Sequence, residues 1–242
     1  TLLTISKVDQ IKLLSHIRNN LQGSKLTKIK VIWLIPARIP ILKISVQEAG
    51  QSIEFDLSIN NILGIKSTEL QNAYANIDPR VPQLVRLIKL FAKNQGISNG
   101  RELISSYGLT LMALVFLQLL KNPILPCLQK DAPPEKKEIA WANQFIEVDL
   151  GFHKDLSQIP GFNPELNRLS IGELFYYFFT FYGEDFDELR GSGMSGGFQY
   201  HISVKQGGIV KQPEPMHELL FSIEDAFDFN HNLGKNIWLY HY

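Results

Sequence analysis

A carboxylate in a strand-like segment is the side chain of this sequence best placed to do chemistry. Asp56 lies within residues 52–59, where apolar and polar side chains alternate. This two-residue period is typical of a half-buried strand, so Asp56 is expected to face away from the apolar side, on a rigid element. An isolated carboxylate on a strand is more often a solvated residue than a catalytic group. Asp56 therefore needs support from other positions.

Two lysines and two serines could bind an anion. Lys89 and Lys93 are spaced one turn apart on a predicted helix, so their ammonium groups project from one face and could bind a polyphosphate. A solvated helix face explains the same spacing. Ser105 and Ser106 precede an apolar helix, where their hydroxyls can cap the first turn and where free N–H groups attract anions. Helix capping and phosphate binding are both open at this point.

Aromatic and acidic residues offer a third kind of chemistry. Tyr107 could stack on a nucleobase, or it could be a core tyrosine. Asp225, Asp228 and His231 gather with several amides near the end of the chain. A lone histidine in such a segment is more often a satisfied loop residue than a ligand. None of these positions identifies a function alone.

Hydrophobic periodicity predicts the elements that position these residues, and together they give an α+β fold. Residues 7–21 are predicted to form an amphipathic helix. Residues 28–34, residues 41–46 and the segment around Asp56 are predicted to form a small mixed sheet that packs on this helix. Beyond residue 68 the pattern is mostly helical. The further predicted helices are 69–76, 78–93, 105–119 and 170–182, and the further strands are 147–152 and 198–204. Residues 191–197 are either a loop tip or a place where sequence has been removed.

Composition limits the classes of protein to which the chain can belong. Its 24 basic and 24 acidic residues balance, so the surface as a whole does not indicate nucleic-acid binding, although a local basic groove stays open. The single cysteine, Cys127, excludes an internal disulfide. The longest apolar run, near residues 109–120, is too short to span a bilayer. The chain starts at Thr1 without an initiating Met, so we expect residues upstream.

The order and spacing of short motifs resemble a known family. The matching segments are Phe55–Asn61, Ser67–Thr68, Ile77–Val81, Lys89–Lys93, Leu103–Gly108, Pro126, Ser170–Leu174 with Phe178–Phe179, Ile223–Asp228 and His231–Gly234. Together they resemble the noncanonical poly(A) polymerases, and particularly their terminal uridylyltransferase branch. The resemblance covers nearly the whole chain, and Pro36–Pro40 matches the segment before the third catalytic strand.

The resemblance implies a fold and a reaction. Residues 1–63 would be part of a nucleotidyltransferase palm whose N-terminal part is missing. Residues 64–242 would be a mostly helical central domain with the PAP-associated segment near 170–234, and the nucleotide would bind in the cleft between the domains. In the family an RNA 3′-hydroxyl attacks the α-phosphate of a nucleoside triphosphate and releases pyrophosphate. Three aspartates hold two Mg²⁺ (or Mn²⁺) ions that stabilise the attacking and leaving oxygens.

Asp56 matches the third of these aspartates, as a catalytic residue and metal ligand. The other two belong to a Gly-Ser…Asp-x-Asp motif, which does not occur in this sequence and by alignment would end just before Thr1. We expect that the first part of the protein is missing from the sequence. The chain as given is therefore expected to be inactive unless upstream residues are present.

The resemblance also assigns nucleotide contacts. Asn61 would contact the base or the ribose, and Ser67 and Thr68 the ribose, although the family has Asn where this chain has Ser67. The residues that would bind the β- and γ-phosphates are Lys89, Lys93 and Ser106. The residues that would bind RNA are Arg38 and Lys43, with Lys28 and Lys30 as further local positive charges.

Base recognition would fall to Tyr107 and to the segment near the end of the chain. Tyr107 would stack on the base, and Asp225 and Asp228 would line its edge, with Ala226 in place of the family's usual Pro and Asp228 in place of the common Glu. His231 would donate to O4 of uracil and crowd the bulkier adenine. The preference for UTP would then amount to roughly 1–3 kcal/mol.

The expected function is an RNA 3′-terminal uridylyltransferase whose partners are UTP and the 3′ end of an RNA. Two alternatives stay open: an ATP-using poly(A) polymerase, and a catalytically inactive nucleotidyltransferase that binds RNA or protein as a scaffold. We expect a monomer without membrane contact, in the cytoplasm, with mitochondrial placement left open.

Overall fold

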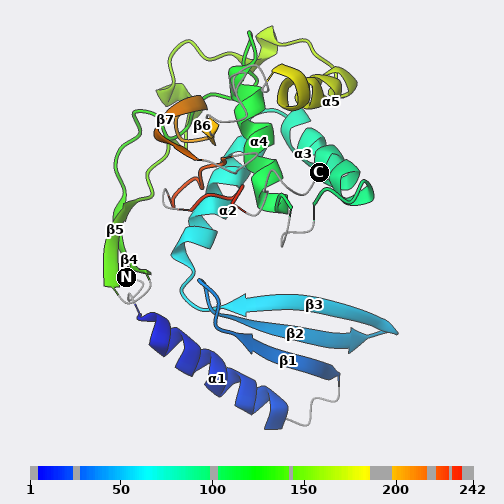
Figure 1. The fold of residues 1–242 in the computed structure, drawn as a ribbon, viewed down its shortest axis with the longest axis vertical. Helices are drawn as coiled ribbons and strands as arrows, with labels where there is room; N and C mark the ends of the chain where they lie inside the picture. Colours follow the sequence, from blue (N-terminus) through cyan, green and yellow to red (C-terminus); the bar gives the residue numbers. More distant parts are fainter. Residues whose placement is uncertain are drawn as a thin grey trace. The chain divides into compact units, whose positions relative to one another are not determined.

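The computed structural model divides the chain into two compact units, each of which is described separately (Figure 1). The described residues are 5–23, 28–98, 103–141, 144–185, 198–216, 222–228 and 231–235. The first unit comprises Thr1–Lys66 and Lys136–Asp149, and the second comprises Ser67–Glu135 and Leu150–Tyr242. Helices and small separate sheets make up both units, which confirms the predicted α+β class.

Among its described residues, the first unit contains the helix α1, the first residues of α2 and two small sheets. Its elements are α1 (Lys7–Gly23), β1 (Ile29–Ile35), β2 (Ile41–Glu48), β3 (Gln51–Ser58), β4 (Lys136–Trp141) and β5 (Gln144–Asp149). The first three strands form one sheet in the order β1-β2-β3, and β4 pairs with β5. Both pairings in the three-stranded sheet are antiparallel, so the prediction of a mixed sheet is wrong. The connections are too short for a parallel crossover, which needs a dozen or more residues.

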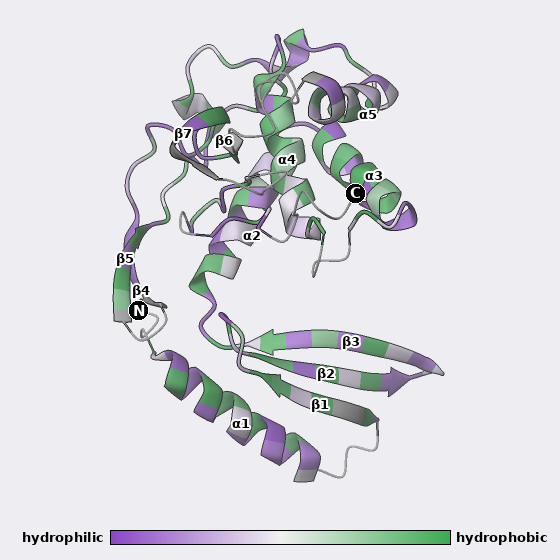
Figure 2. Ribbon diagram, in the orientation of Figure 1, coloured by the Kyte–Doolittle hydropathy of each residue, from purple (hydrophilic) through white to green (hydrophobic). Residues whose placement is uncertain are grey.

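Helix α1 covers one face of the β1-β2-β3 sheet. Leu14 of α1 and Leu42 and Ile44 of β2 are buried at the centre of this interface. Leu42 lies opposite Leu57, and Ile44 lies opposite Phe55, so these β3 side chains share the α1 face. Because side chains alternate along a strand, Asp56 points to the other face, as predicted. Figure 2 shows the alternation of apolar and polar residues along β2 and β3.

The half-burial predicted for the Asp56 strand holds only at its end. Leu57 packs against the α1 core, whereas the side chains of Ile53 and Phe55 are 52% and 47% exposed. The helix packs on β1 and β2, and β3 is the outer strand of the sheet among the strands described. Periodicity reports which residues share a face, but it does not report whether anything covers that face.

The second unit is mostly helical. Its elements are the C-terminal part of α2 (Ile62–Ala75), α3 (Arg80–Asn94), α4 (Ser106–Leu119), two 3₁₀ turns (Leu156–Gln158 and Pro164–Leu166), α5 (Ile171–Thr180) with a π turn (Phe181–Asp185), β6 (Phe198–Ser203) and β7 (Gly208–Met216). The strands β6 and β7 form an antiparallel pair. Among the described helices, none is long and apolar enough to cross a membrane.

Helix α4 is the centre of the second unit. Every residue from Gly108 to Gln118 is buried, which is typical of a helix surrounded by other elements on all sides. Its start is fixed by Ser105, whose hydroxyl accepts a hydrogen bond from the Gly108 N–H. At the other end, Gln118 Nε2 donates to the hydroxyl of the buried Tyr74 at 2.9 Å, which ties α4 to α2.

The helix predictions are confirmed, with different ends. Helix α2 begins at Ile62 and not at residue 69, because the Asn61 side chain accepts from Gly64 N and caps an earlier first turn. Helix α5 starts with a capping box between Ser170 and Glu173. The strand predicted at 147–152 corresponds to β5, which begins and ends three residues earlier, at Gln144–Asp149. The strands β4 and β7 were not predicted. Residues 191–197, for which a loop or a deletion was predicted, lie outside the described residues.

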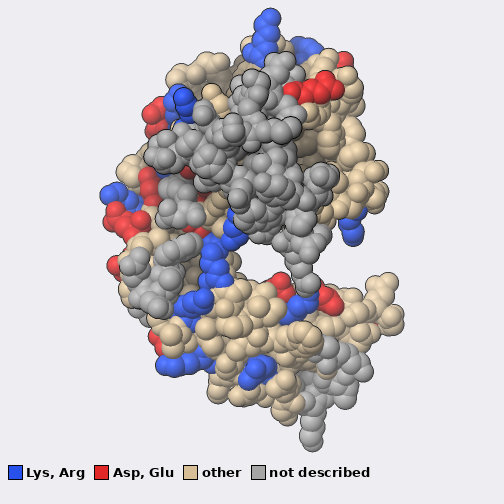
Figure 3. Space-filling view, in the orientation of Figure 1, with Lys and Arg blue, Asp and Glu red and all other residues tan. Residues whose placement is uncertain are grey.

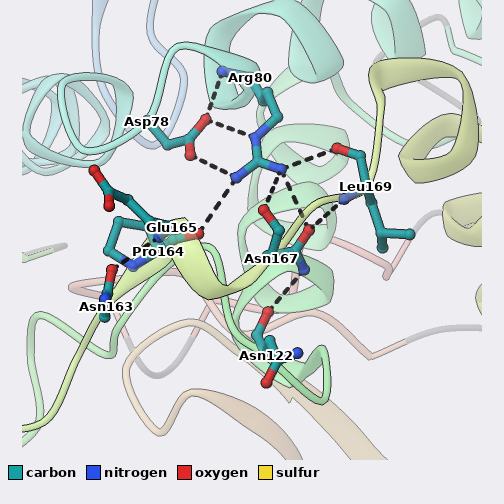
Figure 4. Close-up of polar contacts among 8 residues, drawn as sticks. All are labelled: Asp78, Arg80, Asn122, Asn163, Pro164, Glu165, Asn167 and Leu169. Atoms are coloured by element: carbon teal, nitrogen blue, oxygen red, sulfur yellow. Dashed lines mark hydrogen bonds and ion pairs between the residues drawn. The ribbon is translucent and has the colours of Figure 1, made fainter.

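Arg80 connects the first turn of α3 to the segments before α5 (Figure 4). Its Nε and Nη2 donate to the two carboxylate oxygens of Asp78, at 3.0 and 2.7 Å. Its Nη1 donates to the carbonyls of Asn167 and Leu169, at 3.0 and 2.9 Å. Asn167 in turn donates to the Asn122 carbonyl after α4. The ion pair lowers the pKa of the Asp78 carboxyl and raises that of Arg80.

We expect Arg80→Lys to destabilise the second unit by about 2–4 kcal/mol, because an ammonium cannot make the planar set of bonds that joins Asp78 to two backbone carbonyls. The free energy of unfolding in urea, followed by the helical circular dichroism signal, measures this change. The control is Arg86→Lys, an exposed residue of the same helix, with an expected change of about 0.5 kcal/mol or less. Equal stability of the two variants would contradict the role assigned to Arg80.

Candidate functional site

Asp56 lies on the face of the sheet opposite α1. Its cross-strand neighbour is Lys43, but the Lys43 ammonium pairs with Glu54 at 3.1 Å, on the same face. The Asp56 side chain is exposed. The sheet therefore presents a carboxylate on a rigid strand, where it can bind a cation or a hydroxyl group.

One carboxylate does not make a metal site. Within the described residues, no group of three or more His, Cys, Asp or Glu side chains could hold a metal ion. Magnesium is usually bound by one or two carboxylates together with substrate phosphates and water. Asp56 fits the role of one such ligand, and the described residues do not complete the set.

Two asparagines, Asn60 and Asn61, precede the first turn of α2. Asn60 adopts a left-handed backbone conformation with φ of 54°, which Asn tolerates better than most residues. Asn61 Oδ1 accepts from Gly64 N at 3.0 Å. A Cβ at position 64 would collide with the Asn61 side chain, so Gly64 permits this close capping contact. Asn61 therefore has a structural role that does not depend on a nucleotide.

In the second unit, four of the predicted site residues form one hydrogen-bonded chain. Tyr107 Oη, from the first turn of α4, lies 3.2 Å from Ser67 Oγ on α2 and 3.4 Å from Asp225 Oδ1. Asp225 Oδ2 lies 3.2 Å from His231 Nδ1. The chain joins α2, α4 and the segment 225–231, which are far apart in the sequence.

Asp225 is the central acceptor of this chain. Its side chain is buried, at 8% exposure, and its Oδ1 also accepts from the backbone N–H groups of Phe227 and Asp228, at 3.2 and 3.4 Å. A carboxylate only accepts hydrogen bonds, so His231 Nδ1 must carry the proton that it shares with Asp225. The other ring nitrogen, Nε2, is then an acceptor in the neutral ring and a donor only in the imidazolium.

Tyr107 remains protonated in this environment. Burial, followed by the charge of Asp225, raises the pKa of its hydroxyl above the ordinary value. The hydroxyl has one proton, which it can donate either to Ser67 or to Asp225. Because its hydroxyl is held from both sides, the orientation of the tyrosine ring is fixed.

The predicted phosphate ligands lie on α3 and α4. Lys89 and Lys93 are one turn apart on α3, with Lys93 exposed and Lys89 half-buried. Burial lowers the pKa of Lys89. Ser106 is exposed in the first turn of α4, and Thr68 is exposed on α2. The side chains of these four residues are not part of the hydrogen-bonded chain that joins Ser67, Tyr107, Asp225 and His231.

A second polar cluster, which the sequence did not indicate, anchors the Asp225 segment to β6. Ser203 Oγ donates to Glu224 Oε2, and His201 Nε2 lies 3.9 Å from the same carboxylate oxygen. In the backbone, Ile202 N donates to Ser222 O at 2.8 Å and Glu224 N donates to Ile202 O at 2.9 Å. Residues 222–224 thus extend along β6 like a short added strand. Ser203 and His201 follow an ordinary strand pattern, so no sequence signal could have found them.

Comparisons with known proteins agree on one family. A family model described as "Poly(A) RNA polymerase, mitochondrial-like, central palm domain" matches residues 4–76. Human terminal uridylyltransferase 7 is 32% identical over 212 residues, which are 86% of this chain and 13% of that protein. Poly(A) RNA polymerase GLD2 of Danio rerio is 37% identical over 179 residues, which are 74% of this chain and 34% of that protein. The chain thus spans a small part of these relatives.

Solved structures share the fold over almost the whole chain. The crystal structure of mtPAP in complex with ATPγS aligns with a TM-score of 0.75 and 27% identity, covering 98% of this chain and 47% of that chain. Cid1, described as having RNA terminal uridylyl transferase activity, aligns with a TM-score of 0.72 and 26% identity, covering 97% of this chain and 69% of that one. Cid1 has also been solved with its short product ApU.

Proposed function

The chain belongs to the family of terminal uridylyltransferases and noncanonical poly(A) polymerases, and from this premise we propose that it adds UMP from UTP to the 3′ ends of RNA. The observation that carries the proposal is the hydrogen-bonded chain from Ser67 through Tyr107 and Asp225 to His231. It joins an oriented aromatic ring, which could stack on a base, to a histidine nitrogen, which could read the edge of that base.

Each half of the reaction has candidate residues. Lys89, Lys93 and Ser106 would bind the β- and γ-phosphates, and Lys89 would do so from a partly desolvated position where a charge contact is stronger. Asn61 and Thr68 would contact the ribose, whereas the Ser67 hydroxyl is already close to Tyr107. Asp56 would orient the attacking 3′-hydroxyl. A Mg²⁺ ion at Asp56, with further ligands outside the described residues, would supply charge stabilisation at the reacting oxygens.

Base choice would depend on His231. Uracil, like thymine, presents the acceptor O4, so it needs a donor, whereas the amino groups of cytosine and adenine are donors. With Nδ1 committed to Asp225, His231 can donate to a base through Nε2 only as the imidazolium. Asp228 is buried beside this pair and would line the same base edge.

An ATP-using poly(A) polymerase is the second candidate. The 37% identity to Poly(A) RNA polymerase GLD2 of Danio rerio favours it, and so does the similarity to mtPAP, which has been solved with ATPγS. A direct comparison of UTP and ATP incorporation by the full-length protein distinguishes the two. A full-length protein that incorporates neither nucleotide would support the third possibility, an inactive scaffold.

We expect Asp56→Ala to abolish nucleotide addition by the full-length protein while UTP binding is partly retained, because the triphosphate ligands lie on other elements. Primer extension on labelled RNA measures addition, and titration calorimetry measures UTP affinity. The matched control is Glu54→Ala, which removes a carboxylate from the same face of β3 and should leave addition largely intact. Unchanged addition by Asp56→Ala would refute the catalytic assignment.

We expect His231→Leu to lower the ratio of kcat/KM for UTP to that for ATP about tenfold, since it removes one hydrogen bond and the steric block to adenine. His16→Leu, an exposed histidine of α1, should leave the ratio unchanged. If both variants keep the ratio of the unmodified protein, His231 does not select the base.

A further inference from the structure

The first unit contains a small cavity at one end of its sheet. Residues from four segments line it: Lys7 and Gln10 at the start of α1, Arg38 and Ile39 between β1 and β2, residues 59–63 from the end of β3 into the start of α2, and Ile139 of β4. Its volume is about 50 Å³. A single water needs about 10–15 Å³ on this measure, so the cavity has room for a few waters or for one group of phosphate size.

The lining of this cavity favours an anion. Two side chains, Lys7 and Arg38, are cationic, and three more, Gln10, Asn60 and Asn61, carry amides. None of the residues that line it is Asp or Glu. The cations come from different elements, so their convergence is a product of the fold and not of sequence proximity. A guanidinium with several planar donors is well suited to a phosphate, and a nearby ammonium adds charge.

The geometry around the cavity is rigid on one side. The left-handed backbone at Asn60 and the Asn61 cap on Gly64 fix the path of the connection between β3 and α2. A site whose walls are fixed before binding loses less entropy when the ligand enters. The exposed Arg38 then lies at the edge of a preformed lining.

The cavity is also close to Asp56 along the chain. Ile59, which lines it, follows Asp56 by three residues, a path of about 10 Å in an extended strand. Ile59 packs on the α1 side and Asp56 points to the other face, so an RNA strand that contacts both would pass around the end of the sheet where the cavity lies. If the RNA 3′-hydroxyl binds at Asp56, as the proposed function requires, a phosphate of the last few nucleotides is within reach of the cavity. We propose that the cavity binds a phosphodiester group of the RNA strand near its 3′ end, with Arg38 and Lys7 as the cationic ligands.

This inference rests on the proposed function for the identity of the ligand, and RNA binding tests it without catalysis. The probe is a short, single-stranded, fluorescently labelled oligo(A), titrated with the chain at several salt concentrations. We expect Arg38→Gln and Lys7→Gln each to weaken binding several-fold. Each should also reduce the slope of log K against log salt concentration by about 0.7, the value for one lost contact to a single strand. Titration with UTP should give unchanged affinity.

The control is Lys136→Gln, which removes an exposed cation of the same unit that pairs with Glu147 at 2.9 Å. Its RNA affinity and salt slope should match those of the unmodified chain. Arg38→Gln and Lys7→Gln variants that bind RNA like this control would overturn the phosphate site, as would a loss of UTP affinity equal to the loss of RNA affinity. Failure of the proposed function is a separate outcome, because it would appear as absence of nucleotide addition by the unmodified full-length protein.

Discussion

A buried carboxylate must be satisfied, and this requirement organises the candidate site in the second unit. The Asp225 side chain is almost fully excluded from solvent. It accepts hydrogen bonds from two backbone N–H groups of its own loop, and it lies within hydrogen-bond distance of Tyr107 Oη and His231 Nδ1. An unpaired buried charge would cost several kcal/mol. The segment 225–228, the first turn of α4 and the ring of His231 are therefore held in one arrangement. If Tyr107 and His231 contact a base, the same carboxylate that stabilises the loop also fixes how the base is read.

The sequence was a good guide to elements with a local signal. The continuous apolar run after Ser105 could only be a buried helix, and the Ser170–Glu173 capping box marks the start of α5 directly. It was a poor guide to β4, which begins in a polar stretch and pairs with β5 in a hairpin whose side chains include many exposed residues. Such a hairpin is specified by cross-strand pairing, which leaves little trace in periodicity. The antiparallel pairing of the sheet and the exposure of the β3 side chains likewise depend on tertiary contacts, such as the packing of α1 on β1 and β2.

The candidate site also has a part that the sequence predicted and a part that only the structure gives. The residues Tyr107, Asp225 and His231 were found through their order and spacing within a family pattern, but the contacts among them could not be read from the sequence. Ser67 illustrates the difference. It stands where the family has Asn, and the structure gives its hydroxyl a partner in Tyr107, so the departure from the pattern is accommodated inside the protein. No sequence signal indicated that Lys7 and Arg38 line one cavity, because the two residues lie on a helix and a loop that meet only after folding.

The strand that carries Asp56 also has a consequence for assembly. Among the described strands, β3 is the outer member of its sheet, and Ile53 and Phe55 remain about half exposed beside it. An outer strand with unpaired backbone groups and exposed apolar side chains is a template for another strand. Whatever pairs with β3 will determine the twist and register of the backbone on either side of Asp56. In the part of the fold described, the proposed catalytic carboxylate therefore lies on an outer strand of its sheet.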